Sequence, residues 1–473
     1  MSRQAPSLLA VLVFAGLLLS ACSASGSTLS SEDQIATIVA ATLQAQVVPT
    51  QTAEPIDGVI LPQGAYGDCA NTGQVSIAYV KDGNVWIWVQ GGAHSQLTNA
   101  ADAVDVRISQ DGCRLAYSRA IPNPAYDPSV EFPLPERLEE LWVLASDGSN
   151  NHLLAGLDFY TVLPAAPDGA GYSLYRFAWQ PGGHTVAFGT RLVFGGPGLA
   201  QTNDIHLVNA DGGPLSSLVP PGQGGDFYFS HDGLQLAFST ATSMSVINAD
   251  GSNLRSNLIN FPAVITYSEY LYYPPVHWSP TDNGLMLAVP PEDGLAPPVD
   301  GVYPETTLWY VPLDGTPAWE AGAVQTAWFV SREIQFSPDL GRIAYIRQYG
   351  EPAANQLELV VALSNGSNES PAIQSPEIAF GDWGPDSDQY IYFFRGPGIQ
   401  LWIGSATNPN VTPIAELTAF EAASAEIEWV EGTTFAQLLV GSAGGELSLM
   451  DTSGAGVVID TFAQPFASFD VAN

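Results

Sequence analysis

The sequence predicts an all-β fold, and more specifically a β-propeller of eight blades. Three observations carry this prediction. A strand–turn–strand unit repeats from near residue 70 to the C-terminus. Its strands are rich in β-branched and aromatic residues and are bounded by Gly, Asp and Pro, as is typical of strands joined by tight turns. Hydrophobic residues make up 46% of the chain and charged residues only 13%, which favours a folded chain over a disordered one.

Residues 1–21 are predicted to be a signal peptide. Arg3 precedes an apolar run from Leu8 to Leu19, which is short for a bilayer span. The motif Leu19-Ser20-Ala21-Cys22 resembles the bacterial lipoprotein signal, in which the cysteine becomes lipidated and N-terminal. The resemblance implies a lipid anchor at Cys22 on the extracytoplasmic side, at the outer membrane or the outer face of the cytoplasmic membrane. An ordinary signal peptide with a bystander cysteine is the alternative.

Residues 22–64 are predicted to form a lipidated tether with one short helix. Ser31 can cap this helix, which would run to about Gln46 and end before Pro49. Acidic residues in its first turn suit the positive end of the helix dipole. We expect a stalk that packs on the propeller rather than a helix that binds a partner.

The repeats occupy residues 65–473 and number eight, mostly 47 to 56 residues apart. One such unit cannot bury both faces of its small sheet, whereas a closed ring of units can. The C-terminal segment 466–471 is expected to close the ring by pairing with the first blade. Seven blades is the alternative, because the first and last copies are degenerate. The second strands, aligned, are Ile77-Ala78-Tyr79, Leu115-Ala116-Tyr117, Val186-Ala187-Phe188, Leu236-Ala237-Phe238, Leu287-Ala288-Val289, Ile343-Ala344-Tyr345, Ile391-Tyr392-Phe393 and Leu438-Leu439-Val440.

Three copies of the first strand and its turn make the family resemblance visible. They are Phe229-Ser230-His231-Asp232-Gly233, Trp278-Ser279-Pro280 and Phe336-Ser337-Pro338-Asp339. Each is followed by an apolar second strand, and together they resemble the TolB-like propeller repeats. The resemblance implies the fold, while the function stays open because such repeats serve binding proteins, envelope proteins and the propeller halves of peptidases.

Two cysteines remain after Cys22. Cys69 is expected in the first strand of the first repeat, and Cys113 just after the equivalent turn of the second repeat. Neighbouring repeats are adjacent in space, and disulfides persist outside the cytoplasm. A Cys69–Cys113 disulfide is therefore predicted, with two unpaired thiols as the alternative.

The excess of acidic residues limits the classes of molecule that the protein is expected to bind. Lys and Arg total 13 against 48 Asp and Glu, a formal charge of -35. This balance argues against nucleic acid and against membrane binding through a basic patch. The expected membrane contact is the lipid anchor, the expected partner is an envelope protein or a glycan, and the oligomeric state is left open.

No catalytic or metal motif stands out. The chain has neither His-Glu-x-x-His nor Gly-x-Ser-x-Gly, and His184 and His231 occupy turn positions of the repeat, which favours a structural role. The oxygen-rich turns 248–253 and 382–388 do not complete a twelve-residue calcium loop. We expect no cofactor, with calcium as the alternative.

Long insertions all fall between the second and third strands of a repeat, at 119–138, 189–203, 290–306 and 347–355. They must therefore emerge on one face of the ring. We expect a loop-rich binding face there, against the alternative of decorative loops. Its candidate ligand residues are Tyr126, Glu131, Phe132, Asp300 and Tyr303.

The leading functional hypothesis is a lipid-anchored extracytoplasmic propeller that binds a partner through this face, as a non-catalytic scaffold of the cell envelope. The competing hypothesis is an extracytoplasmic carbohydrate-active lyase or hydrolase with carboxylates in the central funnel. Clustered carboxylates beside an Arg or His would favour the enzyme.

Overall fold

The structure of the chain is a computed structural model. It describes, with short gaps, the part of the chain from residue 54 onward; the signal peptide, Cys22 and the expected helix lie outside the described residues. The described ranges are 54–61, 74–164, 166, 170–195, 204–266, 270–291, 305–326, 334–349, 356–394, 399–408, 412–417, 422–441, 444–463 and 468–472.

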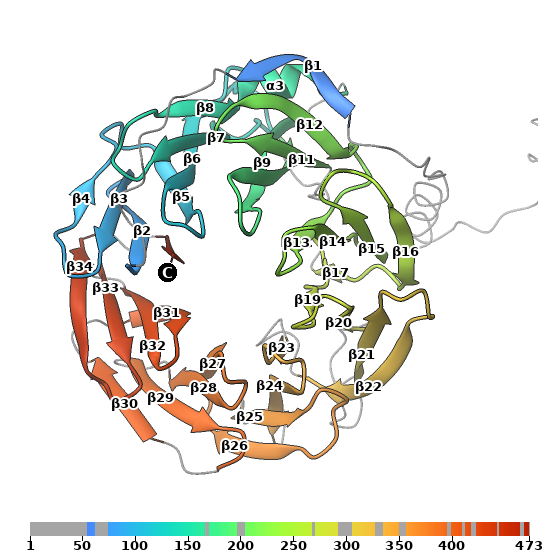
Figure 1. Ribbon diagram of the computed structural model, residues 1–473, viewed down its shortest axis with the longest axis vertical. Helices are drawn as coiled ribbons and strands as arrows, with labels where there is room; N and C mark the ends of the chain where they lie inside the picture. Colours follow the sequence, from blue (N-terminus) through green and yellow to red (C-terminus); the bar gives the residue numbers. More distant parts are fainter. Residues whose placement is uncertain are drawn as a thin grey trace, which may run out of the picture. The chain divides into compact units, whose positions relative to one another are not determined.

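Eight antiparallel sheets follow one another around a ring, which confirms the eight-bladed propeller (Figure 1). We number the blades in the order of their second strands. In blades 1 to 4 the strands, from the ring axis outward, are β35 (Phe469–Ala472), β2 (Ser76–Lys81), β3 (Asn84–Val89) and β4 (Ser95–Gln96); β5 (Ala103–Ile108), β6 (Arg114–Pro122), β7 (Arg137–Ala145) and β8 (His152–Ala155); β9 (Ala170–Trp179), β10 (Thr185–Phe194), β11 (Ile205–Asn209) and β12 (Gly213–Val219); β13 (Asp226–Phe229), β14 (Gln235–Ser239), β15 (Ser243–Asn248) and β16 (Arg255–Asn260).

The other four blades repeat the same order. They consist of β19 (His277–Trp278), β20 (Gly284–Val289), β21 (Glu305–Pro312) and β22 (Trp319–Gln325); β23 (Gln335–Phe336), β24 (Arg342–Tyr349), β25 (Gln356–Leu363) and β26 (Ser370–Gln374); β27 (Ile378–Trp383), β28 (Gln389–Phe394), β29 (Ile399–Ser405) and β30 (Thr412–Leu417); β31 (Ala422–Glu431), β32 (Thr434–Gly441), β33 (Gly444–Asp451) and β34 (Gly456–Phe462).

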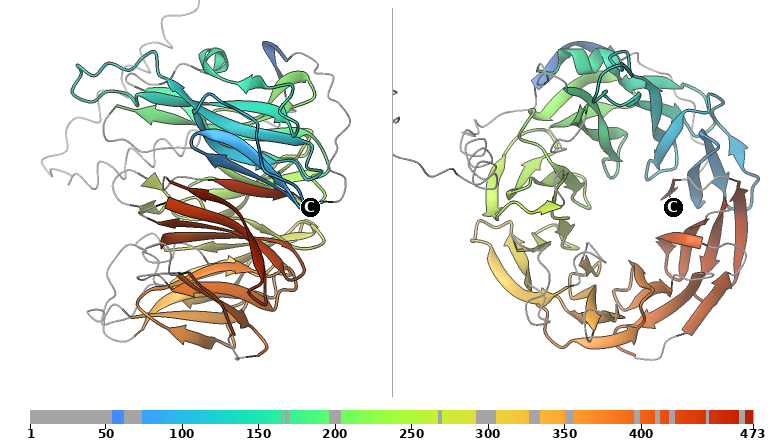
Figure 2. Two further views of the ribbon diagram at one scale, coloured as in Figure 1. Left: turned by 90° about the vertical axis from the view of Figure 1, so that its left-hand side faces the viewer. Right: turned by 180° about the vertical axis from the view of Figure 1, so that it is seen from behind.

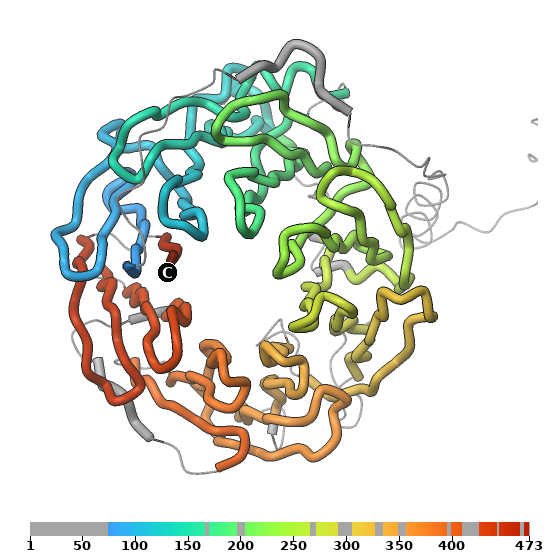
Figure 3. Tube along the Cα trace, in the orientation of Figure 1, coloured from blue at the N-terminus to red at the C-terminus, as the bar shows by residue number. Residues whose placement is uncertain are grey.

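The C-terminus closes the ring, as predicted. Strand β35 pairs with β2 and places Asp470 opposite Ala78 and Val471 opposite Ile77. In Figure 3 the last strand lies beside the first described strand of the ring. We expected the segment around Cys69 to form the innermost strand of blade 1. The C-terminal strand β35 forms it instead.

Three elements lie outside the four-strand pattern. Strand β1 (Glu54–Leu61), which we assigned to the tether, pairs with β12 and makes blade 3 five-stranded. Helix α3 (Leu157–Val162) joins blades 2 and 3, and the short pair β17 (Ile265–Thr266) and β18 (Tyr270–Leu271) follows blade 4. Within the described part of the chain, no helix combines the length and apolar character needed to cross a membrane.

Tryptophans at the ends of inner strands join neighbouring blades. The indole N–H of Trp179 donates to the carbonyl oxygen of Arg107 at 2.9 Å. Trp278 and Trp383 donate likewise to Tyr228 and Gln335, both at 3.0 Å. Each contact joins one blade to the inner strand of the blade before it, so the recurrent aromatic fixes both the packing and the rotation between blades.

The register of the second strands was predicted correctly in five blades and wrongly in three. The residue before the inner-strand aromatic pairs with Ala187, Ala237 or Ala344 in blades 3, 4 and 6, and the equivalent residues Asp470 and Arg107 pair with Ala78 and Ala116 in blades 1 and 2. In blades 5, 7 and 8 the paired residues are Met286, Ile391 and Ala436, rather than Ala288, Tyr392 and Leu439. These strands are apolar on both faces, so alternation could not specify their register.

Candidate functional site

The Ser-x-Asp turns between first and second strands are structural. The Ser337 hydroxyl donates to Asp339 at 2.7 Å and accepts from the backbone N–H of Arg342 at 3.0 Å. Ser109 and Ser230 make the same pair of bonds in their own turns. Each hydroxyl is thus committed to closing its turn, which leaves no serine free to act as a nucleophile there.

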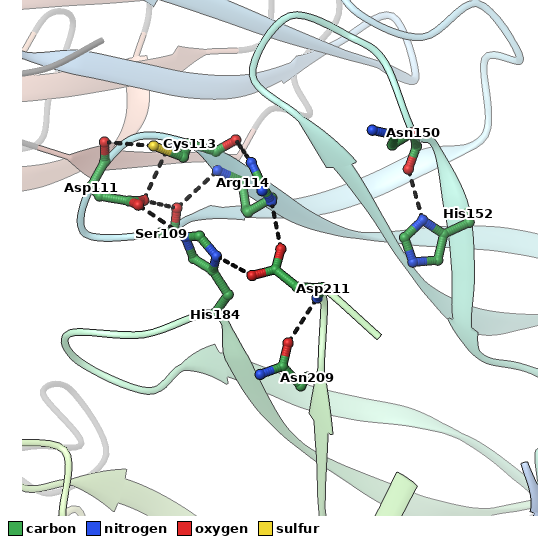
Figure 4. A network of polar contacts seen from close by, with 9 residues as sticks. All are labelled: Ser109, Asp111, Cys113, Arg114, Asn150, His152, His184, Asn209 and Asp211. Atoms are coloured by element: carbon green, nitrogen blue, oxygen red, sulfur yellow. Dashed lines mark hydrogen bonds and ion pairs between the residues drawn. The ribbon is translucent and has the colours of Figure 1, made fainter. Parts of the chain in front are cut away.

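His184 belongs to a polar network that joins the turns of blades 2 and 3 (Figure 4). Its Nε2 lies 2.9 Å from an Asp111 carboxylate oxygen, and its Nδ1 lies 2.7 Å from Asp211. Asp211 also receives the Nε of Arg114 at 3.1 Å. Both ring nitrogens face carboxylates, and the Ser109 hydroxyl donates to Asp111 rather than to the imidazole. The network is therefore a clamp between blades and not a catalytic triad.

His231 plays a similar part between blades 4 and 5. Its Nδ1 lies 2.7 Å from Asp282, which also accepts the backbone N–H groups of His231 and Asp232 at 3.1 Å. The sequence interpretation of both turn histidines as structural agrees with these contacts.

The oxygen-rich turns direct their oxygens at their own backbone. Asp250 accepts the backbone N–H of Ser252 at 2.9 Å and its hydroxyl at 2.6 Å. Asp147 and Asp314 do the same with the residues two positions later. Among the residues that the structure describes, no group of three His, Cys, Asp or Glu side chains is placed to hold a metal ion.

The most distinctive polar side chains lie on the inner strands, at the position just before the recurrent aromatic, or before Val471 and Ile108 in blades 1 and 2. One residue per blade occupies this position, and we call the set the inner ring. The side chain at this position lies on the face of the strand opposite to the aromatic, because strand side chains alternate. In order from blade 1 to blade 8 the inner ring is Asp470, Arg107, Ala178, Tyr228, His277, Gln335, Asp382 and Glu428.

Three consecutive inner-ring positions carry carboxyl groups, Asp382, Glu428 and Asp470, and Arg107 follows them. Burial raises the pKa of Glu428, and the negative charge of Asp470 raises it further. Burial also raises the pKa of Asp470, against the opposing effect of Arg107. We call these three residues the acidic arc. Its carboxyl groups interact with one another across three blades and favour their protonated forms.

The arc is anchored to blade 2. The backbone N–H of Ile108 donates to Asp470 at 2.6 Å. Asp105 lies two residues before Arg107 on the same strand. Its carboxylate accepts a hydrogen bond from the Arg107 guanidinium at 3.0 Å and one from the Ser468 hydroxyl at 2.5 Å. Arg107, which lies beside the acidic arc, is therefore already paired with Asp105, and the arc itself carries only carboxyl groups.

Inner-ring residues of blades 4, 5 and 7 border a cavity of about 280 Å³, which we call the inner cavity. Tyr228, His277 and Asp382 of the inner ring contribute to its lining. Burial raises the pKa of Asp382 to about 7, and burial lowers the pKa of His277 to about 4. Aromatic side chains make up much of the remaining lining, namely Phe229, Trp278, Phe336 and Trp383.

The inner cavity and the long loops belong to opposite faces of the ring. Turn residues between first and second strands, His231 and Pro338 among them, line the cavity. Loop 123–136 joins a second strand to a third strand, and successive antiparallel connections alternate between the two ends of a sheet. Figure 2 shows the blades edge on, with their connections on two opposite faces.

On the predicted loop face, the structure places three of the five candidate residues. Glu131 is exposed, Phe132 is 56% exposed, and Tyr126 is partly buried, all on loop 123–136. Asp300 and Tyr303 lie outside the described residues. The convergence of several long loops on a binding face therefore stays a prediction.

Cys113 is disulfide-bonded. Cys69, its predicted partner, lies outside the described residues, as does Cys22. The disulfide pairing and the lipidation site remain predictions from the sequence.

No protein-family model and no curated protein matches the chain. Solved structures do match, at low identity. A prolyl endopeptidase matches at 15% identity and a TM-score of 0.40, over 61% of this chain and 42% of its own. An oligogalacturonate lyase in complex with manganese matches at 12% and 0.41, over 61% of this chain and 83% of its own. TolB from Acinetobacter baumannii matches at 10% and 0.36, over 76% of this chain and 83% of its own.

The TM-scores of these three structures are all below 0.5, so the β-propeller fold rests on the chain's own eight sheets. The chain spans less than half the length of the prolyl endopeptidase. Sequence identity this low concerns the fold alone, so the function is argued from the chain's own residues.

The sequence interpretation missed the acidic arc. Its residues are far apart in the chain, at Asp382, Glu428 and Asp470, and each looks like an ordinary acidic residue beside a strand. A correct alignment of the inner strands would have identified them, because all three residues occupy the same position on their inner strands.

Proposed function

We propose that this chain is a lipid-anchored extracytoplasmic β-propeller that binds a small ligand in the inner cavity. The observation that supports binding is the cavity itself, a hollow of about 280 Å³ whose lining combines aromatic residues with polar ones, Asp382 and His277 among them. Ligand sites are typically concave and mostly apolar, with a few placed polar groups. This proposal moves the ligand from the loop-rich face to the opposite end of the inner strands.

Blocking the cavity tests ligand binding. Pro338 is exposed and lies at the cavity, and Gln110 and His231 hold the equivalent turn position in other blades. The turn should therefore tolerate Pro338→Trp. Intrinsic tryptophan fluorescence and melting temperature would be followed with a panel of cationic, neutral and saccharide compounds. We expect a compound that shifts both signals in the native protein and neither in the variant. Equal responses in the two proteins would contradict the proposal.

Anchoring has its own test. Expressed in a bacterial host with its signal peptide, the chain should fractionate with the membrane, and Cys22→Ser should release it without changing its melting temperature. Retention of the Cys22→Ser protein in the membrane fraction would exclude the lipid as the anchor.

A second candidate function is acid–base chemistry on a glycan, and the acidic arc favours it. A carboxyl group with a raised pKa can act as a general acid at neutral pH, beside a second carboxylate. Glu428 would hold the proton, and Asp470, whose charge acts on Glu428, would be the second carboxyl group. Product formation from neutral and acidic oligosaccharides, followed by mass spectrometry and lost in Glu428→Gln, would identify this activity.

A further inference from the structure

Another pocket, of about 410 Å³, lies between blades 1 and 2, and we call it the interblade pocket. Blade 1 contributes the end of β4 and the segment that leads to β5, and blade 2 contributes residues of β6 and the residue before β8. The volume is within the roughly 300–1,000 Å³ of typical ligand pockets. None of the described residues that line it also lines the inner cavity, so the two sites are separate.

In blades 1 and 6 a tyrosine and a cation of the second strand share one carboxylate. The two residues are two positions apart and therefore lie on one face of the strand. In blade 6 the Tyr345 hydroxyl and the Nη1 of Arg347 donate to the two oxygens of Glu369, at 2.7 and 2.6 Å. The shared carboxylate holds the tyrosine and the cation together. Blade 1 repeats this arrangement with Tyr79, Lys81 and Asp460.

Blade 2 carries the same pair of residues, Tyr117 and Arg119, but without a shared carboxylate. The Tyr117 hydroxyl donates to Asn151 at 2.8 Å, and Arg119 donates to Asp102 from Nε at 2.9 Å and from Nη2 at 2.6 Å. All four of these residues line the interblade pocket. Among the described residues, none accepts a hydrogen bond from the Nη1 of Arg119, the atom that Arg347 uses to bind its acid. Blade 2 therefore keeps a hydrogen-bond donor unused at this pocket.

The charges of the lining favour a neutral ligand. Arg119 and Asp102 are the only charged residues among the described residues of the lining, and they neutralise each other as a bidentate pair. An anion would meet the Asp102 carboxylate, and a cation would meet the Arg119 guanidinium. Such contacts between like charges are unfavourable.

The polar groups of the lining include both donors and acceptors. The Arg119 guanidinium only donates, the Asp102 carboxylate only accepts, and the amides of Gln96, Asn99 and Asn151 can do both. A hydroxyl group also donates and accepts. A neutral ligand with several hydroxyl groups therefore matches this set of side chains.

We propose that the interblade pocket binds a neutral saccharide, with the Nη1 of Arg119 and the amide of Asn99 donating hydrogen bonds to its hydroxyl groups. Asn99 is exposed, so its amide is accessible to a ligand. Leu97 and Ala100 supply apolar contact for the C–H groups of a sugar ring. This inference goes beyond the proposed function, because it concerns a different pocket.

The test uses two series of sugars that differ in charge. Glucose is compared with glucuronate and glucosamine, and galactose with galacturonate and galactosamine, by isothermal titration calorimetry at pH 6 on the full-length protein in detergent. We expect the neutral sugar of at least one series to bind at least about tenfold more tightly than its charged derivatives. A charged derivative that binds as tightly as its neutral parent would overturn the proposal, and so would the absence of binding by both series.

Arg119→Lys is the main variant. Lysine keeps the positive charge beside Asp102 but lacks the planar fork and its Nη1 donor, so we expect sugar binding to weaken by about tenfold or more. Arg347→Lys is the matched control, because it alters the equivalent pair in blade 6 and does not belong to this lining. It should leave sugar binding unchanged. Asn99→Ala, at an exposed position, should weaken binding by about threefold to tenfold without lowering the melting temperature.

The variants separate this site from the inner cavity. Native affinity for the sugar in both Arg119→Lys and Asn99→Ala would overturn the proposal, as would an equal loss in Arg119→Lys and Arg347→Lys. Loss of sugar binding in Pro338→Trp would assign the sugar to the inner cavity and overturn it as well. Equal responses of the native and Pro338→Trp proteins to the fluorescence panel would remove the proposed function, whereas sugar binding that depends on Arg119 would still support the interblade pocket.

Discussion

Glu428 has an environment very different from that of an exposed carboxyl group. It lies between Asp382 and Asp470 in the inner ring, and burial together with the charge of Asp470 raises its pKa. The folded state therefore holds a proton that the unfolded chain releases near pH 4.3. The resulting stabilisation is fully present below that pH and is lost as the pH rises through the raised folded-state pKa.

We predict that the melting temperature falls between pH 5 and pH 9 and that Glu428→Gln makes this fall smaller. Glutamine cannot ionise, so the variant should match the native protein at about pH 4 and exceed its stability at pH 8 by at least about 1 kcal/mol, since one pKa unit corresponds to about 1.4 kcal/mol. Thermal unfolding at several pH values measures this. Glu377→Gln, at an exposed carboxyl group, is the control. Parallel pH profiles of the native protein and Glu428→Gln would contradict the prediction.

Cys113 gives a second prediction at the residue scale. We expect non-reducing peptide mapping to recover a fragment in which Cys113 is linked to Cys69. The bond would close a loop of about 45 residues and stabilise the fold by about 4 kcal/mol on the chain-entropy model. Cys69→Ser should lower stability by that order and expose one reactive thiol. A Cys113 that stays unreactive in this variant would show that its partner is a different cysteine.

At the scale of the element, the repeated turn is a structural unit because its serine hydroxyl acts as a hydrogen-bond donor and as an acceptor at the same time. Ser337 is buried, so its hydroxyl cannot exchange these partners for water. We predict that Ser337→Ala lowers the free energy of unfolding by about 1–3 kcal/mol, since the Arg342 N–H and the Asp339 carboxylate both lose a partner. Urea unfolding measures the change.

Ser129→Ala is the matched control for that turn. The Ser129 hydroxyl also donates to an aspartate two positions away, Asp127, but Ser129 lies in an exposed loop, where water can replace that bond. We expect its effect to stay within about 0.5 kcal/mol. A loss of equal size in both variants would show that the turn owes its stability to local bonds alone and not to burial.

At the scale of the whole molecule, ring closure depends on one short strand. Phe469 and Ala472 of β35 are buried, and Asp470 joins blade 1 to blade 2 through the backbone of Ile108. We predict that removing residues 469–473 lowers stability by at least about 4 kcal/mol, because one blade loses its inner strand and the first and last blades lose their covalent link. Scanning calorimetry should show a lower, broader transition.

Removal of residue 473 alone is the control for closure and should leave the transition unchanged. A chain lacking residues 469–473 that still unfolds in one sharp transition at the native temperature would show that packing between blades 8 and 1 suffices without the shared strand.

The sequence by itself determined the local pattern of this protein. Asp, Gly and Ser at fixed offsets determine the turns, because their side chains and backbone angles close a turn without help from the rest of the fold. The repeat of that pattern was enough to predict eight blades and the closure of the ring by the C-terminal segment. It was also enough to interpret Ser230, His231 and His184 as structural residues.

Only the tertiary structure decided where the polar residues of different blades meet. Asp382, Glu428 and Asp470 became neighbours because three inner strands hold them at the same height, and a register error of one residue in the sequence alignment would conceal this. Strands buried on both faces carry no alternation to fix that register. The inner cavity and the acidic arc therefore form only when the ring closes, from side chains whose local sequence does not indicate that they will be neighbours.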